Sequence, residues 1–206
     1  MNTEFKHIFI PGDLRLPVLL LLHGTGGDEQ DLVELGQSVS PGSAILSVRG
    51  KVLENGMPRF FRRLAEGVFD LEDLEFRTGE LADFIAEARS EYNLGDAQIV
   101  ALGYSNGANI AASLLLSKAE ALDGAVLLRA MVPFVPQTLP DLTRTKILML
   151  SGLMDPIIPA DNSTRLSEML TEAGADVTFS MKPVSHGLTQ ADFSAIQNWL
   201  ELTYKG

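Results

Sequence analysis

Short apolar runs that alternate with helical patterns are the feature that most restricts the fold of this chain. The runs have the length and composition of buried strands. The predicted strands cover residues 16–22, 44–48, 98–102, 125–128, 146–150 and 176–181, with a short edge strand at 7–10. Strands and helices that alternate along a chain are typical of a mostly parallel sheet with helices on both faces. The sequence therefore predicts an α/β fold.

Five helices are predicted between and after these strands. Asp28 is expected to cap the first helix, and the long second helix is expected to start near Thr78. The third, over residues 108–116, is apolar nearly all round and should be the most buried helix. The last is expected to begin at a capping box formed by Thr189 and Asp192.

The composition restricts the class of protein. With 46% hydrophobic and 21% charged residues, residues 1–206 are expected to form a single domain with a substantial core. The formal net charge of -11 argues against nucleic acid or an anionic membrane surface as a partner, because both need a basic surface. The absence of cysteine excludes disulfides, thiolate metal sites and a cysteine nucleophile. With no signal peptide and no membrane-spanning stretch, a cytoplasmic protein is expected.

The pentapeptide Gly103-Tyr104-Ser105-Asn106-Gly107 has the form G-x-S-x-G and lies between a predicted strand and the apolar helix. A turn this sharp brings the neighbours of the serine close to adjacent backbone, where a Cβ would collide, and this explains the two glycines. The turn leaves the Oγ of Ser105 exposed. Because chance produces the bare pattern in roughly 5 to 10% of such chains, its interpretation depends on the flanking elements and on partner residues.

A serine nucleophile needs a base to remove its proton and a third group to orient that base. His186 is the one histidine that follows Ser105, and it lies between the last predicted strand and the last predicted helix. Asp155 follows the strand at 146–150, and catalytic groups in open α/β sheets gather at such carboxyl ends. We predict a triad of Ser105, His186 and Asp155, with Asp161 as the alternative acid.

Acyl transfer also needs two backbone N–H groups that stabilise the negative charge on the reacting oxygen. One should belong to Asn106, because the start of a helix presents free amides and a favourable dipole to an anion. The other should come from the glycine-rich loop at residues 23–27, where the amide of Thr25 is the predicted donor. His23 is expected to brace this loop by hydrogen bonds rather than to act in catalysis.

The substrate pocket has a weaker signal in the sequence. The segment at residues 50–77 has the least regular pattern and is too long for an ordinary connection, and such loops are often functional. The candidates for the pocket wall are apolar residues of this segment or near the predicted triad, although such residues more often belong to the core. They are Phe60, Phe61, Val68, Phe69, Met131, Met154 and Leu188.

Taken together, these stretches resemble the phospholipase/carboxylesterase family of α/β-hydrolases, which includes acyl-protein thioesterases and small bacterial carboxylesterases. The matching stretches are residues 22–29, 103–109, 152–159 and 185–187, and residues 59–61 resemble an Arg-aromatic segment of the family. The resemblance implies a compact α/β-hydrolase fold without a cap domain, and a serine esterase. Asn106 stands where acyl-protein thioesterases commonly carry glutamine, so the closer resemblance is to the bacterial carboxylesterases.

The sequence thus predicts a serine carboxylesterase that acts on small or short-to-medium-chain esters, with thioesters left open. Such an enzyme needs no metal and no organic cofactor, and its expected partner is a small-molecule ester. Two alternatives stand beside it. One is an acyl-protein thioesterase or lysophospholipase, and the other is a non-catalytic hydrolase-fold protein that binds a ligand. A monomer and a homodimer are both compatible with the sequence.

Overall fold

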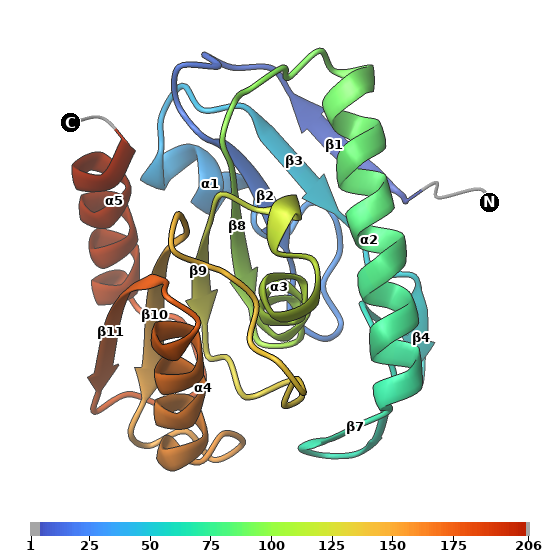
Figure 1. Cartoon of the computed structure of the whole chain (residues 1–206), viewed down its shortest axis with the longest axis vertical. Helices are drawn as coiled ribbons and strands as arrows, with labels where there is room; N and C mark the ends of the chain where they lie inside the picture. Colours follow the sequence, from blue (N-terminus) through green and yellow to red (C-terminus); the bar gives the residue numbers. More distant parts are fainter. Residues whose placement is uncertain (1–4, 205–206) are drawn as a thin grey trace.

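The computed structural model describes residues 5–204, and its centre is a seven-stranded sheet with helices on both faces (Figure 1). The strand order is β1-β3-β2-β8-β9-β10-β11; β1 is antiparallel to β3, and the other neighbours are parallel. The strands are β1 (His7–Ile10), β2 (Val18–Leu22), β3 (Ile45–Val48), β8 (Ile99–Tyr104), β9 (Gly124–Leu128), β10 (Lys146–Gly152) and β11 (Asp176–Lys182). The predicted α/β fold is confirmed.

Two helices cover one face of the sheet and three cover the other (Figure 1). The elements are α1 (Val33–Val39) and α5 (Gln190–Tyr204) on the first face, and α2 (Leu71–Glu91), α3 (Asn106–Ser117) and α4 (Ala160–Glu172) on the second. A short 3₁₀ helix, η1, spans Ala119–Ala121. Strand β2 explains why both faces are covered. Its Leu19 and Leu21 pack with α1 and α5, whereas Leu20 and Leu22 pack on the other side.

Helix α3 is the most buried helix, as its apolar sequence predicts. Every residue from Asn106 to Leu116 is buried. The helix packs against α2, β8 and β9. Burial of each leucine or isoleucine side chain contributes about 1.5–3 kcal/mol. This packing fixes the helix start, and with it Ser105, relative to the centre of the sheet.

Two predicted helix starts are wrong. Helix α2 begins at Leu71 rather than near Thr78, because the side chain of Asp70 accepts the N–H of Asp73 at 3.1 Å and caps the helix there. The sequence pattern does not reveal this start, because Leu71 is 57% exposed and interrupts the apolar stripe of the helix. Asp28 does not cap α1, which begins at Val33; the Asp28 carboxylate accepts a backbone N–H within the preceding loop and pairs with Arg49. The predicted capping box of the last helix is present.

The irregular segment at residues 50–77 contains two small antiparallel hairpins followed by the first turns of α2. The first hairpin pairs β4 (Val52–Glu54) with β5 (Met57–Arg59), and the second pairs β6 (Arg63–Ala65) with β7 (Val68–Phe69). In Figure 1 they lie by the lower end of α2, toward which the parallel strands point. The Gly26 N–H donates to Pro58 O at 2.9 Å, which joins the first hairpin to the loop after β2.

Candidate active site

Ser105 is the single residue between the end of β8 and the start of α3. Its backbone has φ 52 and ψ -113, a conformation that costs a non-glycine residue about 1–3 kcal/mol. A Cβ at Gly103 would lie 2.6 Å from Gly107 O, and one at Gly107 would collide with the backbone of Leu22. The two glycines therefore allow the close packing that holds Ser105 in this strained turn.

The structure brings Ser105, His186 and Asp155 into one hydrogen-bonded chain. The His186 Nε2 lies 2.9 Å from the Ser105 Oγ, and the His186 Nδ1 lies 2.7 Å from the Asp155 Oδ2. With the proton on Nδ1, His186 donates to the carboxylate and can accept the serine proton on Nε2. The Asp155 side chain is 2% exposed and that of His186 is 16% exposed. A partly exposed imidazole is thus oriented by a buried carboxylate.

Local backbone holds Asp155 in place. Its Oδ1 accepts the N–H groups of Ile157 and Ile158 at 2.8 and 3.1 Å, which leaves Oδ2 for His186. The alternative acid, Asp161, is exposed in the first turn of α4, where it accepts the N–H of Asn162. Of the two predicted acids, Asp155 is the one in contact with the histidine.

Hydrogen bonds from three sides fix the loop at residues 23–27. The buried His23 donates from Nδ1 to Gly24 O at 2.6 Å and accepts the Gly50 N–H on Nε2 at 3.0 Å. Arg59 donates to the Thr25 Oγ1 at 2.8 Å. His23 therefore braces the loop, in the manner expected from the sequence.

Thr25 and Asn106 line the same cavity as Ser105 and His186. Asn106 is the first residue of α3, where backbone N–H groups have no acceptor within the helix. Its side-chain Oδ1 accepts the Phe60 N–H at 2.7 Å, which ties the hairpin segment to the start of the helix. Both predicted donors are thus carried by segments that hydrogen bonds hold in place.

The pKa of His23 leads to a prediction about stability. Burial lowers this pKa below its ordinary value of 6.5, against the effect of the Gly24 hydrogen bond and nearby aspartates. The unfolded chain then binds more protons than the native protein in the range below about pH 6.5. The free energy of unfolding should therefore fall as the pH is lowered through about 6.5.

Urea denaturation of wild type and His23→Gln between about pH 8 and about pH 5 measures this effect. Glutamine cannot take up a proton, so the variant should lose less stability on acidification. The rest of the sequence is the same in both proteins, so its contribution cancels in the comparison. If the free energy of unfolding changes equally with pH in the two proteins, the expected contribution of neutral His23 to stability is ruled out.

The cavity at Ser105 has a volume of about 250 Å³. Of the five residues predicted to bind substrate, it includes Met131 and none of Phe60, Phe61, Met154 and Leu188. The lining residues are Thr25, Arg59, Arg63, Gly67, Phe69, Tyr104, Ser105, Asn106, Asn109, Met131, Ile157, Ile158 and His186. The hairpin segment therefore supplies part of the wall through Arg59, Arg63, Gly67 and Phe69.

The four candidates outside the cavity lie elsewhere for physical reasons. Phe60 and Phe61 are 1% and 0% exposed in the core, where Phe60 packs on the His23 ring and Phe61 packs edge-on against Phe69. Met154 is 61% exposed to solvent. Leu188 packs against the apolar cluster that includes Ile196 and Leu200 of α5. Val68, also considered for the wall, is 51% exposed.

Arg129 is a residue of the site that sequence reasoning missed. Its guanidinium is completely buried and donates to the carbonyls of Ser185 and Gly187, at 3.2 and 2.9 Å, on both sides of His186. The same group forms a bidentate pair with Asp192 at 2.8 and 3.3 Å. A sequence signal existed, since a charged residue interrupts an apolar run at the end of β9.

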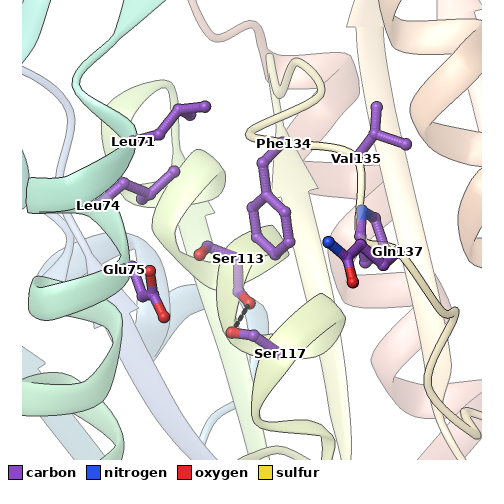
Figure 2. Close-up of a pocket in the computed structure, with 9 residues that line it drawn as sticks. Leu71, Leu74, Glu75, Ser113, Ser117, Phe134, Val135 and Gln137 are labelled. Atoms are coloured by element: carbon purple, nitrogen blue, oxygen red, sulfur yellow. Dashed lines mark hydrogen bonds between the residues drawn. The ribbon is translucent and has the colours of Figure 1, made fainter.

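A second cavity, of about 380 Å³, lies between α2, α3 and the loop at residues 134–137. Figure 2 shows Leu71 and Leu74 on the left, Val135 on the right, and Phe134 in the middle above Ser113 and Ser117 from α3. Its lining contains none of Ser105, Asp155 and His186. This second cavity is therefore separate from the hydrogen-bonded residues Ser105, His186 and Asp155.

None of the helices within residues 5–204 is both long and apolar enough to cross a membrane. Over the same part of the chain, no three aspartate, glutamate or histidine side chains are grouped closely enough to hold a metal ion.

The comparisons with known proteins agree with the fold. The protein MhqD of Bacillus subtilis (strain 168), which is named as a hydrolase, is 46% identical over 94% of this chain and 96% of its own length. A Bacillus cereus carboxylesterase structure is 50% identical, with a TM-score of 0.95 over 98% of this chain and 95% of that one. A carboxylesterase structure from Mesorhizobium loti is 30% identical, with a TM-score of 0.83 over 92% and 90% of the two chains. The Phospholipase/Carboxylesterase family model matches residues 4–204, and the chain belongs to this family.

Proposed function

We propose that this chain, a carboxylic ester hydrolase by its family, hydrolyses small esters through a triad of Ser105, His186 and Asp155. The observation that carries the proposal is the continuous hydrogen-bonded chain from the Ser105 Oγ through the imidazole to the Asp155 carboxylate, at 2.9 and 2.7 Å. A serine in a strained, partly exposed turn with a base and an acid in line has the arrangement that acyl transfer requires.

In the first half of the reaction, His186 takes the Ser105 proton on Nε2 while the Oγ attacks the ester carbonyl. Asp155 holds the imidazole by its Nδ1–H and stabilises the imidazolium that forms. The backbone amides of Thr25 and Asn106 stabilise the negative oxygen of the tetrahedral intermediate. His186 then protonates the departing alcohol and leaves an acyl group on Ser105.

In the second half, water replaces the alcohol. His186 removes a proton from the water as its oxygen attacks the acyl carbonyl, and the same two amides stabilise the second tetrahedral intermediate. Return of the proton to the Ser105 Oγ releases the carboxylic acid. The cycle consumes one ester and one water and regenerates the free enzyme.

The size of the cavity supports short acyl chains as substrates. Its volume of about 250 Å³ lies below the about 300–1,000 Å³ of sites for drug-sized ligands. Met131 and Phe69 give part of the wall an apolar surface suited to a few methylene groups. A long acyl chain would have to leave the cavity and lie against the protein surface.

A panel of aryl esters graded by acyl length tests the proposal. We expect kcat/KM for acetyl and butyryl esters to exceed that for the dodecanoyl ester by at least about tenfold. A matched acetyl thioester in the panel measures the preference between ester and thioester. A maximum at the longest chains, or no ester hydrolysis by folded protein, would contradict the proposal.

Two methionine variants locate the wall that sets this preference. Met131→Ala enlarges the cavity and should move the optimum to longer acyl chains. Met154→Ala, at an exposed position outside the cavity, is the matched control and should leave the optimum in place. If the acyl-length optimum shifts in Met154→Ala and not in Met131→Ala, the substrate binds outside this cavity.

A further inference from the structure

The fixed charges on the wall of the Ser105 cavity are positive, although the chain carries a formal net charge of -11. Arg59 and Arg63 line the cavity, and its lining includes no aspartate or glutamate. The sign of this local charge is opposite to that of the protein as a whole. A field inside a cleft can differ from the field of the whole molecule, because low-dielectric walls focus it.

One carboxylate is shared between the two arginines. The Glu54 Oε2 lies 3.2 Å from the Arg59 Nη1, and the Glu54 Oε1 lies 3.0 Å from the Arg63 Nε. Hydrogen bonding to Arg63 is the largest cause that holds the pKa of Glu54 below its ordinary value, so this side chain is ionised. Two guanidinium groups and one carboxylate leave the cluster with a formal charge of +1.

The two arginines differ in how much of their hydrogen-bonding capacity is used. Arg59 is 4% exposed and donates to the Thr25 Oγ1 and to Phe61 O in addition to its pair with Glu54. Arg63 is 29% exposed, and its Nε is the atom that donates to Glu54. Within residues 5–204, the Arg63 Nη1 and Nη2 donate no hydrogen bond.

The neighbouring Arg62 shows what a purely structural arginine looks like in this segment. It is 59% exposed, and Asp70 and Asp73 both lie within ion-pair distance of its guanidinium. It is absent from the cavity lining. Arg63 therefore differs from Arg62 in two features: it lies on the cavity wall, and it pairs with one carboxylate, which it shares with Arg59, instead of two.

We infer that Arg63 makes this cavity selective for esters that carry an additional carboxylate, an inference that rests on the proposed esterase function. The two terminal nitrogens of a guanidinium match the two oxygens of a carboxylate. A cluster charge of +1 balances a single carboxylate, whereas a phosphate, with a charge near -2, would be only half balanced. The carboxylate stays intact through the reaction, in which water cleaves the ester into an acid and an alcohol.

Two matched pairs of esters test the inference on the purified enzyme. In the first pair, 4-acetoxybenzoate carries a carboxylate on the alcohol side, and 4-acetoxybenzamide is its neutral counterpart. In the second pair, monophenyl adipate carries the carboxylate on the acyl side, and phenyl hexanoate is neutral. The measured quantity is the ratio of kcat/KM for the charged ester to kcat/KM for the neutral ester, after subtraction of spontaneous hydrolysis.

In at least one pair, the wild-type ratio should exceed one and should decrease as salt is added, because salt screens the attraction. Arg63→Gln should lower that ratio by about tenfold, the effect of one hydrogen-bonded charge. Arg63→Lys keeps the positive charge and should retain most of the ratio. The matched control, Arg62→Gln, should leave the ratio at the wild-type value.

The possible failures are distinguishable. If folded wild-type protein hydrolyses none of the four esters, the proposed esterase function itself fails. If it hydrolyses the neutral esters but favours the charged ester in neither pair, the esterase function stands and the role of Arg63 is overturned. A ratio that is the same in wild type and Arg63→Gln overturns it as well.

Discussion

Replacing Ser105 with alanine should lower kcat for short aryl esters by about 10⁶-fold, because the attacking oxygen is removed. Asp155→Asn should cost about 10⁴-fold, since an amide cannot hold the Nδ1–H tautomer that leaves the His186 Nε2 free to accept the serine proton. Initial rates at saturating butyryl ester measure both effects. The smaller loss in the aspartate variant is expected because this variant keeps the Ser105 nucleophile as well as His186.

Folding controls separate loss of chemistry from loss of structure. Alanine at position 105 keeps the backbone turn, so Ser105→Ala should retain a urea midpoint near that of wild type. Ser194→Ala, which removes an exposed serine hydroxyl from α5, is the matched control and should keep wild-type kcat. Retention of wild-type turnover by folded Ser105→Ala would contradict the assignment of the nucleophile.

Arg129→Met should produce the second large effect, on stability and on kcat together. The substitution leaves the Asp192 carboxylate, 2% exposed, without its cationic partner, and breaking such a buried pair costs about 3–5 kcal/mol. Burial opposes ionisation of Asp192, and the hydrogen bonds from Arg129 and Thr189 outweigh it and lower the pKa of this carboxyl. Urea unfolding at neutral pH measures the loss.

The same variant should lower kcat by about 100-fold with little change in KM, because the carbonyls of Ser185 and Gly187 lose the group that holds the His186 loop. Arg129 is a positioning residue in this account, since it does not line the Ser105 cavity.

A double variant separates the two effects of Arg129. In Arg129→Met with Asp192→Leu, both buried charges are gone, and replacement of a buried pair by apolar groups is often neutral for stability. Stability should therefore recover, apart from about 1 kcal/mol for the lost cap of α5. The low kcat should persist. Recovery of kcat together with stability would show that Arg129 acts on the fold alone.

The sequence predicted the fold and the chain order of Ser105, Asp155 and His186 because these depend on local signals. A strand next to a glycine-flanked serine, an acid after a later strand and a histidine before the last helix are all visible in short windows. Asp155 and His186 then meet because parallel strands end at one edge of the sheet.

The features that the sequence did not reveal depend on distant partners. Arg129 bonds to residues 21 to 63 positions away, so no local pattern shows what it holds. Phe60 and Phe61 were candidates for the pocket although such aromatics are more often core, and tertiary packing places both of them in the core. The start of α2 was misplaced because Leu71 and Phe76 are exposed and interrupt the helical periodicity.

The most direct test of the central claim is labelling with a fluorophosphonate, followed by mass spectrometry of the peptides. An activated serine attacks the phosphorus and retains the phosphonyl group, whereas an ordinary serine hydroxyl is a poor nucleophile. We expect one label per chain on the peptide that contains Ser105, with ester hydrolysis lost in proportion to labelling, and no label in Ser105→Ala. A folded, ester-hydrolysing protein in which Ser105 remains unlabelled would contradict the account.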